Sequence, residues 1–414
     1  MTQENKNFRL GVANGAFFML ASTFISGNIV MPLFLQNFTG SKALIGLASA
    51  FLSLGWFLPQ FFEGYFAEKK STRMPIYRFA AWIRMVAFAL LTFAVILLAE
   101  NKTAFSVTVI MTLIFFYAFS GGISGLAFMD LVAKTIPVRR RGAFFGARLF
   151  FGGVLSLGGS WVVGKVISSE ELVFPFNFVL LFLLAFIMIS TAILLYMRVK
   201  EPAGHGVINR SFRDYYEDTI ESVKQNSTYR RLIVTRWLCG ASSIAFPFYV
   251  LNGINTLGIS KNAVGAFLVA QVLGGIISNM FWGRLGDKKG NKLLLQLYAG
   301  LSLAAPAIAL MASIFAPWKE LYVLVFLILG IADSGATIGF FNFLLEISPE
   351  SKRSSHIGFM HTVISPVLLI SMLGGLLMDR FSGVTYNYIF LIAGLFGIAG
   401  LIMTFKLKEP RGKA

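Results

Sequence analysis

A lone carboxylate lies near the middle of a long apolar segment of this sequence. Asp333 stands in residues 320–346, about 13 residues, or roughly 20 Å along a helix, from the end of the segment that we place inside the cell. A charge at such depth costs roughly 2.5 to 3.5 kcal/mol on insertion scales, and the side chain is too short to reach water. Because desolvation favours the neutral form, this carboxylate could take up and release a proton or bind a cationic group. Thr337, one helical turn further on the same face, could share the site. The alternative is a hydrogen-bonded structural aspartate.

Arginines occur in three other apolar segments. Arg148 and Arg236 lie about a turn and a half inside the boundary that we assign to the cytoplasm, and Arg84 lies somewhat deeper. Each could extend its side chain to the lipid headgroups. No basic residue shares the depth of Asp333 in this assignment, so an ionised Asp333 needs water, a cation or a cationic ligand. If the arginines instead face a cavity, an anionic ligand or a lipid headgroup becomes the better expectation.

Weaker polar signals lie at similar depths. We expect packing rather than ligand contact for each, because small polar residues commonly hold membrane helices together. They are Ser26, Asn28, Gln271 and Asn279. His361 lies near the cytoplasmic end of its segment, which favours an interfacial group over a proton relay.

The segments that carry these residues are long and apolar enough to cross a membrane. Hydrophobic residues make up 56% of the 414 residues and charged residues only 13%, and the mean hydropathy is +0.73. A helix needs about 20 apolar residues to span a bilayer core. Twelve segments qualify: residues 10–35, 43–67, 75–99, 104–132, 143–168, 172–198, 232–252, 262–286, 292–316, 320–346, 356–378 and 383–406. The sequence therefore predicts an all-α integral membrane protein with twelve transmembrane helices.

The placement of Lys and Arg predicts the orientation. A net charge of +17 would also suit nucleic acid, but in a membrane protein the position of the charges is the informative quantity. With the N-terminus inside, each outer loop holds about one basic residue, whereas inner loops hold groups such as Lys134 with Arg139 and Arg140. We expect both termini in the cytoplasm, a location in the cytoplasmic (inner) membrane, and no nucleic-acid partner. The first segment lacks a small-residue cleavage site and should be retained. Cys239 is the only cysteine, which excludes an intrachain disulfide or a cysteine metal site.

Two stretches of the chain repeat one pattern. Gly64 and Glu68, followed by two lysines, recur 219 positions later as Gly283 and Asp287, again followed by two lysines. A second register, offset by 212, pairs Pro137 with Pro349, Arg141 with Arg353 and Gly146 with Gly358. Each pattern lies at a loop between apolar segments, so the duplicated unit is a bundle of several spans. We predict two six-helix bundles, residues 1–198 and 232–414, with a site between them.

Residues 199–231 form the only long polar stretch and join the two bundles. Ser211 with Asp214 resembles a capping box at the start of a helix. Four apolar residues then recur at helical spacing, namely Phe212, Tyr216, Ile220 and Val223. We predict an amphipathic helix along the cytoplasmic face, in a linker that only tethers the halves.

The repeated loops resemble the loop signature of the major facilitator superfamily. In that family a glycine, an acid four residues on and then basic residues join helices 2 and 3, and again helices 8 and 9. The two stretches here are Gly64-Tyr-Phe-Ala-Glu68-Lys-Lys-Ser-Thr-Arg73 and Gly283-Arg-Leu-Gly-Asp287-Lys-Lys-Gly-Asn-Lys292. The first departs from the pattern with Glu68 for the usual Asp and Ser71 for the usual Gly. The resemblance covers almost the whole chain and implies two pseudo-symmetric bundles with a midplane site between them.

The resemblance also implies a conformational gate at the cytoplasmic ends of the helices. Glu68 and Arg73 would pair with Asp130, whereas Asp287 and Lys292 would meet Asn342 in place of a carboxylate. The full gate set is Gly64, Glu68, Arg73, Asp130, Gly283, Asp287, Lys292, Arg141 and Arg353. The missing carboxylate suggests a stronger lock in the N-terminal half. The alternative is that these charges are ordinary cytoplasmic anchors.

Several activities lack the residues that they would need. The sequence has no Walker-type loop, no HExxH motif and only three histidines, so we expect no enzyme, no cofactor and no ATP-driven transport. The glycine-rich segment 143–168 contains no proline. The Gly-Pro antiporter signature of many drug exchangers in the family is therefore missing, which argues against a typical multidrug exporter without excluding efflux.

These observations and the resemblance together imply a monomeric secondary active transporter. It would move a small organic solute by alternating access, with protons coupled through Asp333 and with the arginines, serine, amides and Thr337 named above as further site residues. The 43 phenylalanines and the few midplane charges favour an amphipathic or weakly cationic solute. A lipid or lysolipid translocator of the same fold is the alternative, followed by a non-transporting receptor or assembly protein.

Overall fold

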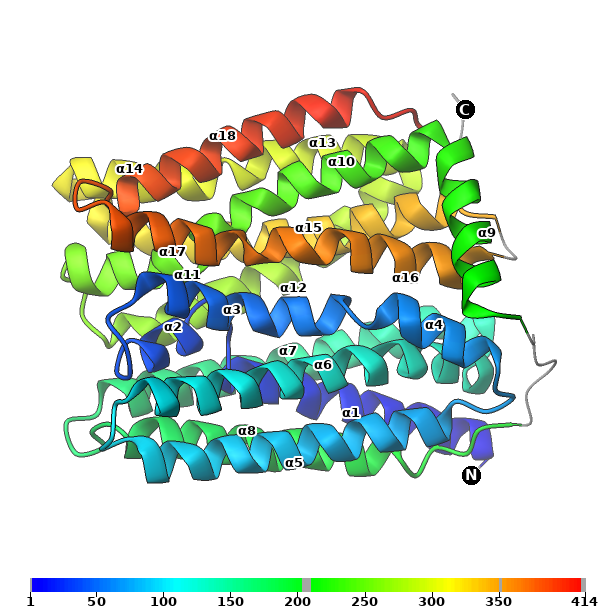
Figure 1. The fold of residues 1–414 in the computed structure, drawn as a ribbon, viewed down its shortest axis with the longest axis horizontal. Helices are drawn as coiled ribbons and strands as arrows, with labels where there is room; N and C mark the ends of the chain where they lie inside the picture. Colours follow the sequence, from blue (N-terminus) through cyan, green and yellow to red (C-terminus); the bar gives the residue numbers. More distant parts are fainter. Residues whose placement is uncertain (1, 203–209, 350–351, 411–414) are drawn as a thin grey trace.

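The computed structural model describes residues 2–202, 210–349 and 352–410, which form a bundle of roughly antiparallel helices (Figure 1). The N-terminal half consists of α1 Gln3–Phe24, α2 Val30–Leu35, α3 Lys42–Phe57, α4 Gln60–Glu68, α5 Met74–Leu98, α6 Ala104–Thr135, α7 Val138–Ser168 and α8 Phe176–Tyr196. The linker carries α9 Phe212–Gln225. The C-terminal half consists of α10 Ser227–Ala241, α11 Phe246–Leu251, α12 Ala263–Lys289, α13 Asn291–Ser302, α14 Ala304–Ile314, α15 Val323–Ile347, α16 Arg353–Ile364, α17 Ile370–Arg380 and α18 Tyr386–Phe405. Short 3-10 or π segments join some of these, namely η1 Ser242–Ala245, η2 Asn252–Thr256, η3 Ala316–Tyr322 and η5 Ser365–Leu369.

The predicted twelve-helix architecture is confirmed. Within the described residues, eleven helical segments are long and apolar enough to cross a membrane. The twelfth is α1 with α2, which lies among the others in Figure 1 but contains several polar residues in its first turns. The predicted spans differ from the observed helices by a few residues at most ends. The helix that opens the C-terminal half begins at Ser227 and includes residues that the sequence assigned to the linker, while residues 203–209 of that linker and residues 411–414 lie outside the described residues.

Five of the spans are interrupted, and a proline lies at each interruption. The prolines are Pro32 in α2, Pro59 before α4, Pro247 in α11, Pro306 in α14 and Pro366 in η5. Proline lacks the N–H of a helical hydrogen bond and clashes with the preceding turn. The sequence predicts each of these spans as continuous, because a helix break within an apolar segment does not change its mean hydropathy.

Both described ends of the chain and α9 lie at one end of the bundle (Figure 1). We call this the linker end and the other the opposite end. The halves meet where α3 packs against α17, α4 against α16, and α7 against α12. Near the opposite end the contact between α7 and α12 requires glycine, since a Cβ atom on Gly164 would lie 2.8 Å from the Cα atom of Gly265.

The linker helix begins as predicted but buries a different face. Ser211 and Asp214 form the capping box, with the Ser211 hydroxyl accepting from the Asp214 N–H at 3.0 Å and the Asp214 carboxylate accepting from the Ser211 N–H at 3.2 Å. The buried residues are Tyr215, Thr219 and Val223, whereas Tyr216 is exposed. The predicted apolar face is therefore wrong by about one residue, because tertiary contacts of Tyr215 outweigh the local pattern.

Candidate functional site

Asp333 lies midway along α15 and lines two cavities. The first, of about 220 Å³, lies mainly within the C-terminal half and is closed on one side by Ser53 and Phe57 of α3. The second, of about 360 Å³, lies between α1 and α7 of one half and α12 and α15 of the other. We call them the inner cavity and the interface cavity. Thr337 lines both, as its spacing from Asp333 predicts.

The carboxylate of Asp333 has no hydrogen-bond or ion-pair partner among the described residues. The Asp333 side chain is exposed although it lies in the middle of a helix long enough to span a membrane, because it faces the two cavities. The neighbouring Ser334 does have a partner and donates to the Asn279 side-chain oxygen at 2.6 Å, joining α15 to α12. Of these two neighbours, only Asp333 therefore has no hydrogen-bond partner among the described residues.

Arg236 shares the inner cavity with Asp333. Its guanidinium lies over the ring of Phe340, 5.0 Å from the centroid, and over that of Phe57 at 5.8 Å. Phe340 is seven residues from Asp333 on α15, about 10 Å along the helix, so the arginine lies nearer the linker end than the carboxylate. The expectation that Asp333 would have no cation near it is thus incomplete, since helix rotation turns Arg236 inward rather than toward the headgroups.

The other two arginines lie within the packing of the N-terminal half. Arg84 is buried, donates to the Tyr117 hydroxyl at 3.1 Å and lies over the rings of Phe18 and Trp56. Arg148 binds the side-chain oxygen of Asn14 at 2.9 Å and also a carbonyl of α1. Neither lines the two cavities around Asp333.

The remaining midplane candidates divide between the interface cavity and the helix junctions. Ser26, Gln271 and Asn279 line the interface cavity. Asn28 lies in the break between α1 and α2 and lines neither cavity. Three of the four weaker candidates are therefore positioned where a solute could reach them.

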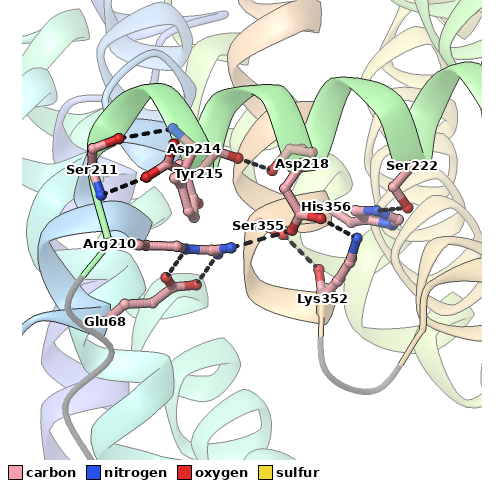
Figure 2. Close-up of polar contacts among 11 residues, drawn as sticks. Glu68, Arg210, Ser211, Asp214, Tyr215, Asp218, Ser222, Lys352, Ser355 and His356 are labelled. Carbon is pink, nitrogen blue, oxygen red and sulfur yellow. Dashed lines mark hydrogen bonds and ion pairs between the residues drawn. The ribbon is translucent and has the colours of Figure 1, made fainter.

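The ion pairs predicted for the N-terminal half are found with one change of partner. Arg73 pairs with Asp130 at 2.9 Å, as expected. Glu68 pairs instead with Arg210 of the linker, through two bonds of 2.9 and 3.0 Å (Figure 2). The expectation that Glu68 would join Asp130 is wrong, because Arg210 supplies a cation whose fork matches both carboxylate oxygens.

Figure 2 shows that α9 connects the two halves at the linker end. Arg210 also binds Asp218 at 3.2 Å, and Asp218 binds Lys352 of the C-terminal half. The hydrogen bond from Lys352 lowers the pKa of Asp218. Further along α9, the Ser222 hydroxyl lies 3.0 Å from the His356 ring. We call these contacts of Arg210, Asp218 and Ser222 the α9 clamp.

Gly64 has a packing role in this region that Gly283 lacks. A Cβ atom on Gly64 would lie 2.9 Å from the hydroxyl of Tyr215 on α9, whereas the corresponding space at Gly283 is open. The two glycines of the repeated loop are therefore equivalent in sequence but differ in surroundings, because only the first lies beneath the linker helix.

Beneath the α9 clamp, α4 packs directly against α16 and closes the halves together. The His361 ring binds the side-chain oxygen of Gln60, and the Thr362 hydroxyl donates to the carbonyl of Leu58 at 2.9 Å. Phe57, which borders the inner cavity, packs against the His361 ring. His361 thus lies between the halves, below the inner cavity, rather than at a lipid interface.

A second repeat that the sequence analysis missed completes the linker-end contacts. Lys-Glu-Pro occurs at residues 200–202 and again at 408–410, after the last span of each half. The carboxylate of Glu201 accepts from the N–H groups of Arg73 and Met74, and that of Glu409 accepts from the N–H of Lys292 at 2.9 Å. Each therefore caps the start of a helix that follows a signature loop, α5 or α13. The repeat itself was the signal that could have found them.

These caps correct the expected gate of the C-terminal half. Lys292 contacts Glu409 through its main chain rather than Asn342, and the Asn291 side chain donates to Glu346 at 2.8 Å. Carboxylates are thus present at the start of α13, but they belong to Glu346 and Glu409 rather than to residue 342. In the N-terminal half, burial opposes ionisation of Glu201, yet hydrogen bonds from Lys134, Met74 and Arg73 outweigh it and lower the pKa of Glu201.

The two remaining basic residues of the gate set occupy helix ends. Arg141 donates to the carbonyl oxygens of Ile136 at 3.1 Å and Ala133 at 2.6 Å, at the end of α6. Arg353 begins α16 and is exposed. Arg141 therefore stabilises the turn between α6 and α7 within one half.

A carboxylate also joins the halves at the opposite end. Asp379, near the end of α17, accepts from the Ser41 hydroxyl at 2.7 Å and from the N–H groups of Lys42 and Ala43 at 2.8 and 2.9 Å. These donors form the N-terminus of α3, where a negative charge is stabilised. Polar contacts thus join the halves at both ends, with Asp333 and its cavities between them.

Comparison with known proteins agrees with this arrangement. Residues 232–414 match the model of the Major Facilitator Superfamily. The crystal structure of a D-xylose-proton symporter is similar over 100% of both chains, with a TM-score of 0.74 and 15% identity. That of the nucleoside transporter NupG, in a mutant form, covers 99% of this chain and 100% of its own, with a TM-score of 0.72 and 13% identity. A bacterial homologue of the iron transporter ferroportin, in an inward-facing state, covers 98% of both chains with a TM-score of 0.68 and 13% identity. No curated protein matches the sequence.

In sequence, the C-terminal half of the chain, residues 232–414, matches the Major Facilitator Superfamily model. The fold matches that of solved transporters over the whole length. It is a multi-pass membrane protein with the fold of a transporter. At such low identities the structural likeness defines the fold and leaves the solute to the chemistry of the site.

Proposed function

We propose that this protein is a secondary transporter that exchanges a small organic, amphipathic solute for protons at Asp333 by alternating access. The observation that carries the proposal is the carboxylate itself, which lines both cavities between the ends of the bundle and has no partner in the described residues. Aromatic and hydroxyl side chains around it, including Tyr249, Tyr298 and Ser243, suit a solute with both apolar and polar parts.

Competition for one carboxylate supports exchange. An ionised carboxylate surrounded by protein and lipid is costly unless its charge is neutralised. A proton or a cationic group of the solute can each neutralise Asp333, but they cannot do so together. The groups that line the inner cavity near Asp333 and can carry charge are Arg236, Tyr298, Tyr249 and Cys239, and none is an acid that ionises at neutral pH in water. Asp333 is therefore our choice for the group that alternates between proton and solute.

The contacts at the two ends support alternating access. At the linker end, which the positive charges assign to the cytoplasm, the α9 clamp and the Gln60–His361 contact join the halves. At the opposite end, Asp379 binds the start of α3. Each set can break while the other holds, because the two sets share no residue. An inward proton gradient would then drive the solute outward.

The test is solute-induced proton movement in vesicles that contain the full chain and an internal pH-sensitive dye. A chemically broad solute panel is added under a pH gradient, and thermal stabilisation of the purified protein at pH 5.5 and 8 selects the hits beforehand. We expect Asp333→Asn to abolish proton movement, while Glu320→Gln, an exposed carboxylate in η3, leaves it unchanged. Transport by Asp333→Asn with unaltered pH dependence refutes the proposal. Stabilisation by lipids alone would favour the lipid translocator.

A further inference from the structure

We infer that the solute is a zwitterion whose anionic group binds Arg236 while its cationic group binds Asp333. This names the substrate class of the proposed transporter and rests on that function. The two side chains line the same inner cavity from α10 and α15, with opposite charges and without contact between them. A solute with complementary charges would neutralise both at once.

Arg236 differs from the other two intramembrane arginines in having no oxygen acceptor among the described residues. Arg84 binds the Tyr117 hydroxyl, and Arg148 binds Asn14 and a carbonyl. Within the described part of the chain, the structure places the Arg236 guanidinium against the ring faces of Phe57 and Phe340 and gives it no hydrogen-bond acceptor. Aromatic faces attract a cation but leave its N–H donors unsatisfied, and a guanidinium has five of them in a planar fork. The fork matches a carboxylate or a phosphate.

A third polar group in the inner cavity lacks a partner. The hydroxyl of Ser243 in η1 is buried and makes no hydrogen bond to any residue that the structure describes. Buried polar groups are normally hydrogen-bonded, and an exception within a cavity indicates a group reserved for a ligand or for water. Together with Arg236 and Asp333, it gives the cavity an anion-binding end, a cation-binding end and a hydroxyl between apolar walls.

The geometry also limits the distance between the two charges of the solute. Asp333 and Phe340, the ring beneath the guanidinium, are about 10 Å apart along α15. The two charges of the solute should therefore lie several ångströms apart, up to about 10 Å, as in an ω-amino acid or a dipeptide. The inner cavity of about 220 Å³ has the volume of about seven water molecules, which suits solutes of this size.

The same chemistry occurs in the headgroup of phosphatidylethanolamine, which carries a phosphate and an amine. The inner cavity fits the headgroup alone, so a lipid would have to place its acyl chains elsewhere. The experiment therefore includes a soluble arm and a lipid arm.

The first arm measures thermal stabilisation of the purified full chain by a ladder of ω-amino acids from β-alanine to 8-aminooctanoate, together with α-amino acids, dipeptides and carnitine. Each hit is compared with its methyl ester, which lacks the anion, and its N-acetyl derivative, which lacks the cation. We expect at least a tenfold weaker apparent affinity for both single-charge derivatives. In the ladder, we expect the response to pass through a maximum at an intermediate length. The lipid arm uses lysophosphatidylethanolamine against glycerophosphoethanolamine; a response to the lysolipid alone assigns the same site to a lipid.

Variants test which residue binds which charge of the solute. Arg236→Gln should bind the zwitterion about as weakly as the wild-type protein binds its methyl ester, and Arg236→Lys should recover part of the lost affinity. The exposed Arg230→Gln on the same helix is the matched control. The derivative comparison uses wild-type protein alone, so the inference remains testable if a variant misfolds. If no zwitterion of either arm stabilises the protein, or if esters bind as well as zwitterions, the inference is wrong. Exchange of a singly charged solute for protons would overturn it while leaving the proposed function intact.

Discussion

Removing Arg210 should open the linker end of the bundle. In the structure this side chain binds both oxygens of Glu68 on α4 and also Asp218 on α9, which itself binds Lys352 of the other half. It therefore links the first half to the clamp that reaches the second. Arg210→Ala deletes three hydrogen bonds between charged groups and leaves Glu68 without its partner.

The magnitude follows from how well these groups are shielded from water. The Arg210 and Glu68 side chains are 26% and 19% exposed, so the pair is neither a free surface pair nor a fully buried one. Exposed pairs contribute up to about 1 kcal/mol, and hydrogen bonds to charged groups about 1.5 to 3 kcal/mol. We expect a loss of about 1 to 2 kcal/mol from the closed arrangement, a factor of about 5 to 30 in its population relative to the open one.

The only cysteine of the chain provides the assay. Cys239 lines the inner cavity and is 8% exposed. A membrane-impermeant thiol reagent applied at the linker end, in inside-out vesicles, should modify Cys239 about 5 to 30 times faster in Arg210→Ala than in wild type, following the shift in population. Cys239→Ser supplies the background.

The matched control is Arg213→Ala on the same helix. Arg213 is 83% exposed, and its one ion pair among the described residues is with Glu217, one turn away on the same helix. Because such an exposed pair contributes little and does not join the halves, removing Arg213 should change the rate less than about twofold. Equal rates in the two variants would show that the α9 clamp does not hold the halves together. A double-mutant cycle with Glu68→Gln should show coupling, and strict additivity would contradict the pairing.

Three further outcomes are expected. Glu201→Gln should lower the free energy of unfolding at neutral pH by about 1 to 2 kcal/mol. The folded state lowers the pKa of this carboxyl, so its contribution to stability is present at pH values above the ordinary carboxyl pKa of about 4.3 and is lost as the pH falls through the folded pKa. The melting temperatures of wild type and variant should therefore converge between pH 7 and pH 4, and parallel curves would exclude the cap. Asp379→Asn should weaken the opposite-end contact by about 1 kcal/mol and raise Cys239 labelling from that end, whereas an unchanged rate would show that this contact does not limit access. Gly46→Ala should prevent closure at the opposite end, since its Cβ atom would clash with the Ser371 carbonyl oxygen. An unchanged rate of Cys239 labelling from that end would contradict the close packing.

The membrane architecture could be predicted because it depends on local composition. A span of about 20 apolar residues is recognisable without knowledge of its neighbours, and the repeated loops at Gly64 and Gly283 show the duplication directly. The pair of Arg73 and Asp130 could also be predicted, since the resemblance names both positions. The prolines at 59 and 366 could have indicated the helix breaks there, but the apolar pattern continues through both positions and predicts unbroken spans.

The partners of the charged residues could not be predicted in the same way. Glu68 pairs with a residue 142 positions away on the linker, and no local pattern links the two. The buried face of α9 is set by Tyr215 against Gly64, a long-range contact that changes the helix rotation by one residue. Glu201 and Glu409 share a short repeat, but the N–H groups that they cap lie 127 and 117 positions away, so no local pattern predicts these contacts.

The class of protein, the number and order of the spans, the duplication and the position of Asp333 along its span can all be predicted from the chain alone, because each is a property of composition or of spacing along one helix. The direction in which the arginines face depends on tertiary packing. Arg84, Arg148 and Arg236 look alike as cations in apolar spans, yet two are bound within the N-terminal half and one faces the inner cavity with Asp333. That difference comes from the rotation of each helix against its neighbours, which is fixed by packing between residues far apart in the chain.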